Sequence, residues 1–199
     1  MNPKSYSKYK YEDLINLGIQ VKRTEIFGKI VDSKPSDYLL ETLSFNSQLP
    51  MATEKAKCEL IISPILNEVV RKNLKKLTYF SGYNFDVDEK NGLKGFCDYL
   101  ISAIYDSPMI EAPIISIIEA KNDNFELGIP QCIATMYAAQ IFNERKGKEQ
   151  KSVYGAVSIG TEWQFLKLEN MIAYQDTEYY SIRNLPELLG VLQTIVEEY

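Results

Sequence analysis

Histidine is absent from this chain of 199 residues. Without an imidazole, the chain cannot build a Ser-His-Asp or Cys-His nucleophilic site, a histidine-ligated zinc site, or a histidine general base. Any catalysis must therefore use carboxylates, lysines, tyrosines or hydroxyl groups.

Cysteine is also scarce, and its spacing is uninformative for metal binding. The three cysteines, Cys58, Cys97 and Cys132, lie more than 30 residues apart. Their number is odd and no Cys-x-x-Cys spacing occurs, so the sequence predicts neither a disulfide framework nor a zinc knuckle. We expect reduced thiols packed as small apolar groups, as in cytoplasmic proteins.

Long apolar runs are missing as well. No run approaches the roughly 18 apolar residues that read as a membrane-spanning helix. The first ten residues are polar and contain no apolar signal region. The expectation is a soluble cytoplasmic protein without membrane association.

The overall composition is typical of a globular protein. The sequence is 45% hydrophobic and 25% charged, which is close to the average of folded proteins. Its length fits one domain over 1–199, large enough to bury a core without disulfides or a structural metal. The net charge of -5 argues against non-specific coating of nucleic acid and leaves local basic patches open.

Hydrophobic periodicity predicts the main helices. Apolar steps of four, three and four residues indicate a long helix over 51–74, which Pro64 should kink or split. A second helix is expected to begin with Pro130 at its first position and to run to about 145, preceded by a loop over 122–130. A third is expected near the C-terminus.

Strands are predicted between these helices. The segment 113–121 contains four isoleucines in five positions, which is typical of a central strand covered on both faces. Aromatic and β-branched residues indicate further strands over 78–87, 95–103, 152–159, 162–168 and 173–182. The order of elements predicts an α/β fold with a mixed sheet between helices.

Charged residues at the end of the central strand are the strongest local anomaly. Glu119 and Lys121 are two positions apart and therefore share a face. They could simply pair with each other at the rim of the sheet. However, Asp98 interrupts the otherwise apolar strand before this one and would stand beside Glu119 if the two strands pair. Two adjacent carboxylates repel each other, and a divalent cation or a shared proton relieves that repulsion.

A third carboxylate comes from the long helix. Glu59 lies beside the apolar stripe that contains Ile62 and Leu66, where it can face the pair or remain a solvated glutamate on the helix flank. Hard oxygen ligands suit Mg²⁺, which acidifies water and offsets phosphate charge, while Lys121 can orient or deprotonate that water. The residues therefore suffice for a phosphodiesterase without histidine.

Asp98 followed by Glu119-Ala120-Lys121 resembles the motif of the PD-(D/E)XK nuclease superfamily, which includes many restriction endonucleases. Cys97 replaces the proline of the name. The resemblance implies a restriction-endonuclease-like α-β-β-β-α-β core over about 51–160, with an N-terminal extension (1–50) and C-terminal strands and helix (161–199). It also implies a Mg²⁺- or Mn²⁺-dependent hydrolase, an endonuclease or exonuclease.

The resemblance further implies a role for each motif residue. Asp98, Glu119 and Lys121 would be catalytic, and Gln131 would support them. The metal ligands would be Glu59, Asp98, Glu119 and the carbonyl group of Ala120.

Two basic clusters are candidate contacts for DNA phosphates. They contain Arg71, Lys72, Lys75 and Lys76, and Arg145 and Lys146. Basic residues also favour helix C-termini for electrostatic reasons alone. DNA is the expected partner, and a homodimer is left open. The alternatives are a non-catalytic PD-(D/E)XK-like interaction or assembly module and, lower in rank, a small-molecule phosphohydrolase, for which no glycine-rich phosphate loop is present.

Overall fold

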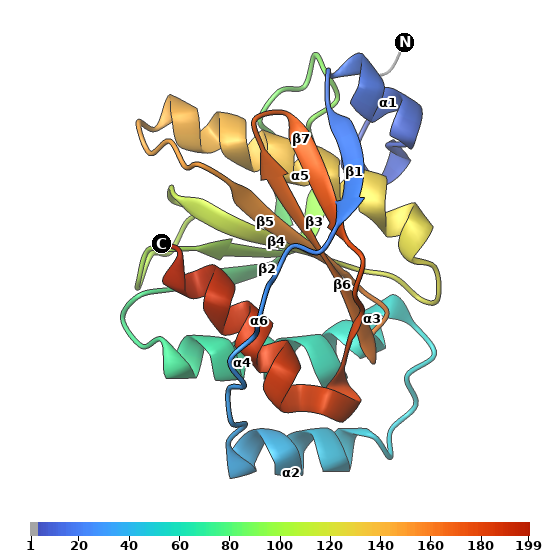
Figure 1. Cartoon of the computed structure of the whole chain (residues 1–199), viewed down its shortest axis with the longest axis vertical. Coiled ribbons are helices and arrows are strands. Elements are labelled where there is room, and N and C mark those ends of the chain that lie inside the picture. The colour runs from blue at the N-terminus through green and yellow to red at the C-terminus, as the bar shows by residue number, and fades with distance from the viewer. Residues whose placement is uncertain (1–3) are drawn as a thin grey trace.

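A computed structural model describes residues 4–199 of the chain. Within these residues the strands form one mixed sheet in the order β1-β7-β6-β5-β4-β3-β2, with β8 paired to β6 (Figure 1). The strands are β1 (Gln20–Thr24), β2 (Thr78–Asn84), β3 (Phe96–Ser102), β4 (Ile114–Ala120), β5 (Val153–Ser158), β6 (Glu162–Glu169), β7 (Ile172–Asp176) and β8 (Tyr180–Ser181). The expected α/β fold with a mixed sheet between helices is confirmed.

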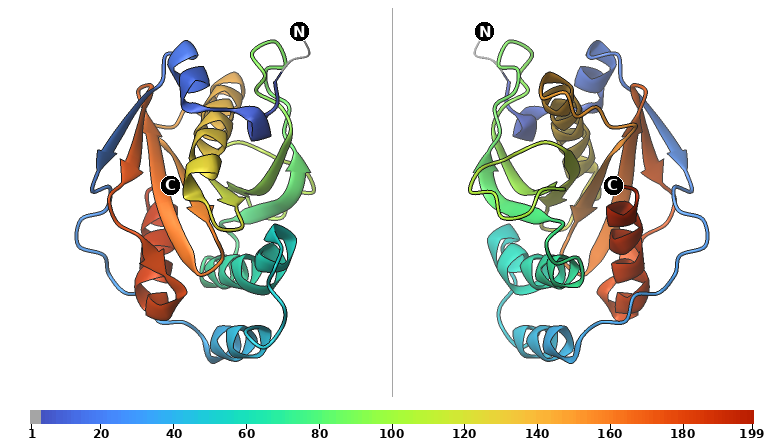
Figure 2. Two further views of the ribbon diagram at one scale, coloured as in Figure 1. Left: turned by 90° about the vertical axis from the view of Figure 1, so that its right-hand side faces the viewer. Right: turned by 90° about the vertical axis from the view of Figure 1, so that its left-hand side faces the viewer.

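Helices cover both faces of the sheet (Figure 2). The helical elements are η1 (Tyr6–Lys8), α1 (Tyr11–Asn16), α2 (Asp37–Asn46), α3 (Glu54–Lys57), η2 (Cys58–Ile62), α4 (Ser63–Lys72), α5 (Phe125–Arg145), η3 (Ile182–Asn184) and α6 (Leu185–Glu197). One apolar core joins the sheet to α5, α1 and η1, and the other joins it to α4 and α6 with α2 outside them. No helix within residues 4–199 is long and apolar enough to cross a membrane.

The central strand is the one that the sequence predicts. Every residue of β4 is buried, because α5 covers one face and residues of the other core cover the opposite face. β4 pairs antiparallel with β3 and parallel with β5. The segment from α3 to β5 therefore has the order helix, three strands, helix, strand. The extensions join the same sheet, since β1 pairs with β7.

The long helix predicted over 51–74 is divided, as the position of Pro64 suggested. α3 is followed by the π-helical turn η2, and Pro64 lies in the first turn of α4. Proline has no N–H group and cannot donate to the carbonyl group of Leu60, four residues earlier. The side-chain amide of Asn46, on α2, donates to that carbonyl oxygen at 2.8 Å instead.

Helix α5 begins five residues earlier than predicted. The side chain of Asn124 accepts a hydrogen bond from the Glu126 amide at 2.9 Å and caps the helix there. Pro130 is consequently inside the helix, and only residues 122–124 of the expected loop are non-helical. A Cβ atom on Gly128 would lie 2.6 Å from Val157 of β5, so this glycine lets α5 approach the sheet closely.

The strand predicted over 173–182 is also interrupted. β7 ends at Asp176, whose side chain accepts a hydrogen bond from the Glu178 amide at 3.2 Å. The chain then turns, and the short strand β8 pairs with β6.

Candidate functional site

Asp98 and Glu119 come together where β3 begins and β4 ends. Tyr99 pairs with Ile118 in the antiparallel ladder. The neighbouring residues Asp98 and Glu119 are therefore placed side by side. A carboxylate oxygen of Asp98 (Oδ2) accepts a hydrogen bond from the Ala120 amide at 2.7 Å. The side chain of Asp98 is therefore held against the end of β4, beside Glu119 as expected.

Glu119 is fully buried, and its carboxylate is only half satisfied. Oε2 accepts a hydrogen bond from the Gln131 side chain of α5 at 2.6 Å. Oε1 has no hydrogen-bond partner within the described residues. Burial raises the pKa of Glu119 well above its ordinary value, the negative charge of Asp98 raises it further, and Lys121 opposes these effects. A buried carboxylate in this state needs either a proton or a cation.

Lys121 places a positive charge at the same strand end. Its ammonium group donates to the carbonyl oxygen of Ala120 at 2.8 Å. Lys121 and Gln131 line one cavity on the α5 side of the sheet, so Lys121 shares the face that Glu119 uses to reach Gln131. The structure thus brings together four of the predicted site residues and the Ala120 carbonyl group.

Glu54 is a further acidic residue that the sequence reasoning missed. It opens α3, whose N-cap is Thr53, and it lines a hollow together with Asp98. Its charge contributes to the raised pKa of Glu119. Burial, followed by the charge of Asp98 and then Glu54, raises the pKa of Cys58 to about 11. The signal that could have identified Glu54 is its place in a first helical turn after a capping threonine.

Glu59 lies on the rim of the same hollow. Its side chain is 63% exposed, and its carboxylate is 3.8 Å from the Lys55 ammonium group. These are the surroundings of a solvated glutamate on a helix flank, the alternative reading of this residue.

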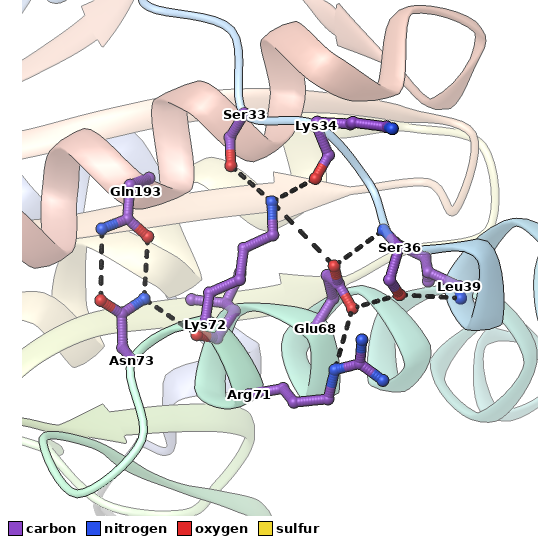
Figure 3. A network of polar contacts seen from close by, with 10 residues as sticks. Ser33, Lys34, Ser36, Leu39, Glu68, Arg71, Lys72, Asn73 and Gln193 are labelled. Atoms are coloured by element: carbon purple, nitrogen blue, oxygen red, sulfur yellow. Dashed lines mark hydrogen bonds and ion pairs between the residues drawn. The ribbon is translucent and has the colours of Figure 1, made fainter.

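Several residues of the basic clusters have structural partners. Lys72 donates to the Ser33 hydroxyl at 2.7 Å and also contacts the Lys34 carbonyl group (Figure 3). The buried carboxylate of Glu68 lies 3.7 Å from Arg71 and 4.0 Å from Lys72, and accepts two hydrogen bonds from Ser36. This network ties α4 to the start of α2.

Both basic clusters lie at the far end of β4. The first precedes β2, and Thr78 of β2 pairs with Ser102, which pairs with Ile114 at the start of β4. The second follows Asn143, whose side chain bonds to both backbone groups of Ile114. Since a seven-residue strand spans roughly 20 Å, the structure does not bring these clusters to Glu119.

Other lysines stand near the site instead. Lys8 and Lys10 line the cavity that contains Lys121 and Gln131. Lys57 of α3 contacts the carbonyl oxygen of Asn122, directly after the motif. The sequence reasoning did not single out these three lysines.

The described residues hold no group of three or more Asp, Glu, Cys or His side chains arranged to bind a metal ion. No protein-family model matches the chain, and no curated protein matches it. The assignment of a function therefore depends on the geometry at the ends of β3 and β4.

Proposed function

We propose that this chain is a Mg²⁺- or Mn²⁺-dependent nuclease that hydrolyses phosphodiester bonds of DNA. The observation that carries the proposal is the carboxylate of Glu119, fully buried with one oxygen unpartnered, beside Asp98 and Lys121. Such a carboxylate is costly in a purely structural role, because the Gln131 hydrogen bond and the charge of Lys121 compensate its desolvation only in part.

The oxygen atoms at this strand end fit a magnesium-like ion. They are Oε1 of Glu119, which has no partner within the described residues, the carboxylate of Asp98, and the carbonyl group of Ala120, which accepts a hydrogen bond from Lys121 in this structure. Mg²⁺ keeps several waters and commonly binds proteins through one or two carboxylates plus substrate phosphates. Two carboxylates and one carbonyl group therefore suffice, and Glu54 adds negative charge nearby.

In this proposal the carboxylates bind the metal ion, and Lys121 acts on the attacking water and the phosphate. Asp98 and Glu119 would hold the divalent ion, which would supply an acidified water and neutralise charge on the phosphate. Asp98 is oriented by the Ala120 amide, and Glu119 by Gln131. Lys121, which lies against the Ala120 carbonyl group, positions the attacking water and offsets phosphate charge.

The topology supports a restriction-endonuclease-like core. The elements α3–α4, β2, β3, β4, α5 and β5 follow one another in the α-β-β-β-α-β order. The acidic pair comes from β3 and β4, the second and third strands of this order, and Gln131 comes from its second helix. These are the places that the PD-(D/E)XK resemblance implies.

A second candidate is a non-catalytic interaction module with the same core. The observation that favours it is the position of the basic clusters, which lie away from the acidic pair and partly within structural contacts.

Titration of Mg²⁺ and Mn²⁺ by calorimetry tests the proposed site. We expect the wild-type protein to bind at least one ion and Asp98→Asn to lose that binding. Asp106→Asn is the matched control, because Asp106 is exposed in the loop before β4. Undetectable binding by the wild type, or unchanged binding by Asp98→Asn, would contradict the proposal.

A further inference from the structure

A cavity of about 640 Å³ adjoins the candidate active site. One wall is the N-terminal segment over 7–12, and the other is the first two turns of α5. Lys121 and Gln131 line the end nearest to Glu119. The cavity therefore reaches Lys121, one of the proposed catalytic residues, and Gln131, which donates to Glu119.

The N-terminal wall is held in place by the hydroxyl groups of three tyrosines. The Tyr6 hydroxyl donates to the Phe85 carbonyl group at 2.7 Å, and the Tyr9 hydroxyl donates to the Asn91 carbonyl group at 2.6 Å. The Tyr11 hydroxyl reaches across to Glu126 of α5 at 3.1 Å. The cavity is consequently formed before any ligand enters it.

The lining combines apolar surface with positive charge. Tyr11, Leu127 and Pro130 supply flat or apolar surface, and Leu127 is 67% exposed. Lys8 and Lys10 add ammonium groups beside that of Lys121. An apolar slot with lysines beside it matches a nucleobase attached to phosphates. Glu12 and Glu126 also line the cavity and offer acceptors for the amino groups of a base.

We propose that this cavity holds one unpaired nucleotide of the DNA strand whose phosphodiester lies at Lys121. The inference rests on the proposed function and specifies its substrate class. A cavity of this volume accommodates a ligand of drug-like size, such as one nucleotide, whereas a base pair still stacked in a duplex cannot enter it. The substrate is therefore single-stranded DNA, a strand end or a branch, in preference to continuous duplex.

Two leucines of equal exposure provide a matched test. Leu127 and Leu74 are each 67% exposed, so a charge at either position should leave folding intact. Leu127 lines the cavity, whereas Leu74 follows α4 among the basic residues at the opposite end of the sheet. The readout is the affinity for a fluorescein-labelled single-stranded 10-mer and for the matching duplex, measured by anisotropy with Ca²⁺ present.

We expect the wild type to prefer the single strand. Leu127→Glu should weaken that binding by about ten-fold or more, the order of loss when a stacking contact is removed, while Leu74→Glu stays at the wild-type value. Tyr11→Ala should lose a similar factor. Tyr11→Phe, which keeps the ring and removes only the bond to Glu126, should retain binding.

The remaining outcomes separate this inference from the proposed function. Wild-type affinity in Leu127→Glu, a loss in Leu74→Glu alone, or no preference for the single strand would overturn the inference even if the protein cleaves DNA. If the wild type cleaves no DNA but its binding is lost in Leu127→Glu, the cavity holds the nucleotide and only the proposed hydrolysis fails.

Discussion

At the end of β4, the positive charge of Lys121 partly offsets the cost of burying the Glu119 carboxylate. Burial and the charge of Asp98 raise the pKa of Glu119, and Lys121 lowers it. The Lys121 ammonium group donates a hydrogen bond to the Ala120 carbonyl oxygen. Oε1 of Glu119 is left without a partner within the described residues. Charge compensation is therefore incomplete in the protein alone, which is the condition that a bound cation relieves.

Lys121→Ala should separate metal binding from catalysis. We expect the rate of Mg²⁺-dependent DNA cleavage to fall by ~10²–10⁴-fold, the range for loss of one acid–base group, while calorimetric Mg²⁺ affinity is maintained. Lys90→Ala, at an exposed position in the β2–β3 loop, should match the wild type. A Lys121→Ala variant with undiminished cleavage would remove this lysine from the mechanism.

At the scale of elements, the break between α3 and α4 determines how the glutamates before α4 are placed relative to its apolar stripe. The π-helical turn η2 inserts about one extra residue, which rotates the preceding helix by roughly 100° relative to a continuous α-helix. Extending the apolar stripe of α4 backwards therefore selects Glu59 and passes over Glu54, although both residues line the hollow with Asp98 and the charge of Glu54 contributes to the raised pKa of Glu119. Helical periodicity in the sequence carries no signal for such a turn.

Asn46→Ala tests how this break is stabilised. The variant removes the side-chain donor to the Leu60 carbonyl group, and we expect the free energy of unfolding to fall by about 1 kcal/mol. Urea denaturation of a double-mutant cycle with Pro64→Ala measures the coupling. Because alanine restores an N–H group that can reach Leu60, the cost of Asn46→Ala should be smaller in that background. Equal costs in both backgrounds would show that Asn46 does not replace the missing proline donor.

The long, strongly patterned elements were predictable, and their ends were less so. The isoleucines of 114–118 identify the buried strand because both of its faces are covered. The start of α5 was misplaced because the Asn124 cap competes successfully with the preference of Pro130 for a first turn. The sequence shows that Asn124 can cap a helix, but it does not show that this cap, and not Pro130, sets where α5 begins.

At the scale of the whole molecule, strand order and pairing in the sheet determine which distant residues lie close together, and sequence spacing alone does not predict this. The juxtaposition of Asp98 and Glu119 follows from pairing of two adjacent strands, which the order of elements indicates. The location of the basic clusters depends on which end of the sheet each helix reaches, and sequence spacing contains no such information. The packing of the N-terminal segment beside Lys121 is a contact between distant parts of the chain and was likewise not predictable.

Asp176 should make overall stability depend on pH. It is fully buried where the chain after β1 meets the end of β7, and accepts hydrogen bonds from Ile26, Glu178 and Tyr180. Burial raises its pKa above the ordinary value of 3.8, although these hydrogen bonds oppose the shift. Between the two pKa values the folded state keeps a proton that the unfolded chain has released, so stability decreases as pH rises through that window.

Asp176→Asn should remove this component of the pH dependence. We expect urea denaturation between about pH 4 and pH 7 to show a steeper decrease in the free energy of unfolding for the wild type than for the variant. The difference between the two proteins isolates Asp176 from Glu119, whose raised pKa acts in the same direction. Parallel pH profiles would mean that Asp176 has the same pKa in the folded and unfolded states.

Cleavage of end-labelled DNA is the most direct test of a metal-dependent nuclease. The measurement compares single-stranded, duplex and branched substrates with Mg²⁺, Mn²⁺ or Ca²⁺, for the wild type and Glu119→Gln. We predict cleavage by the wild type with Mg²⁺ or Mn²⁺, binding without cleavage with Ca²⁺ because its flexible coordination positions water poorly, and no cleavage by Glu119→Gln. Intact DNA under every condition, or equal cleavage by both proteins, would contradict the account.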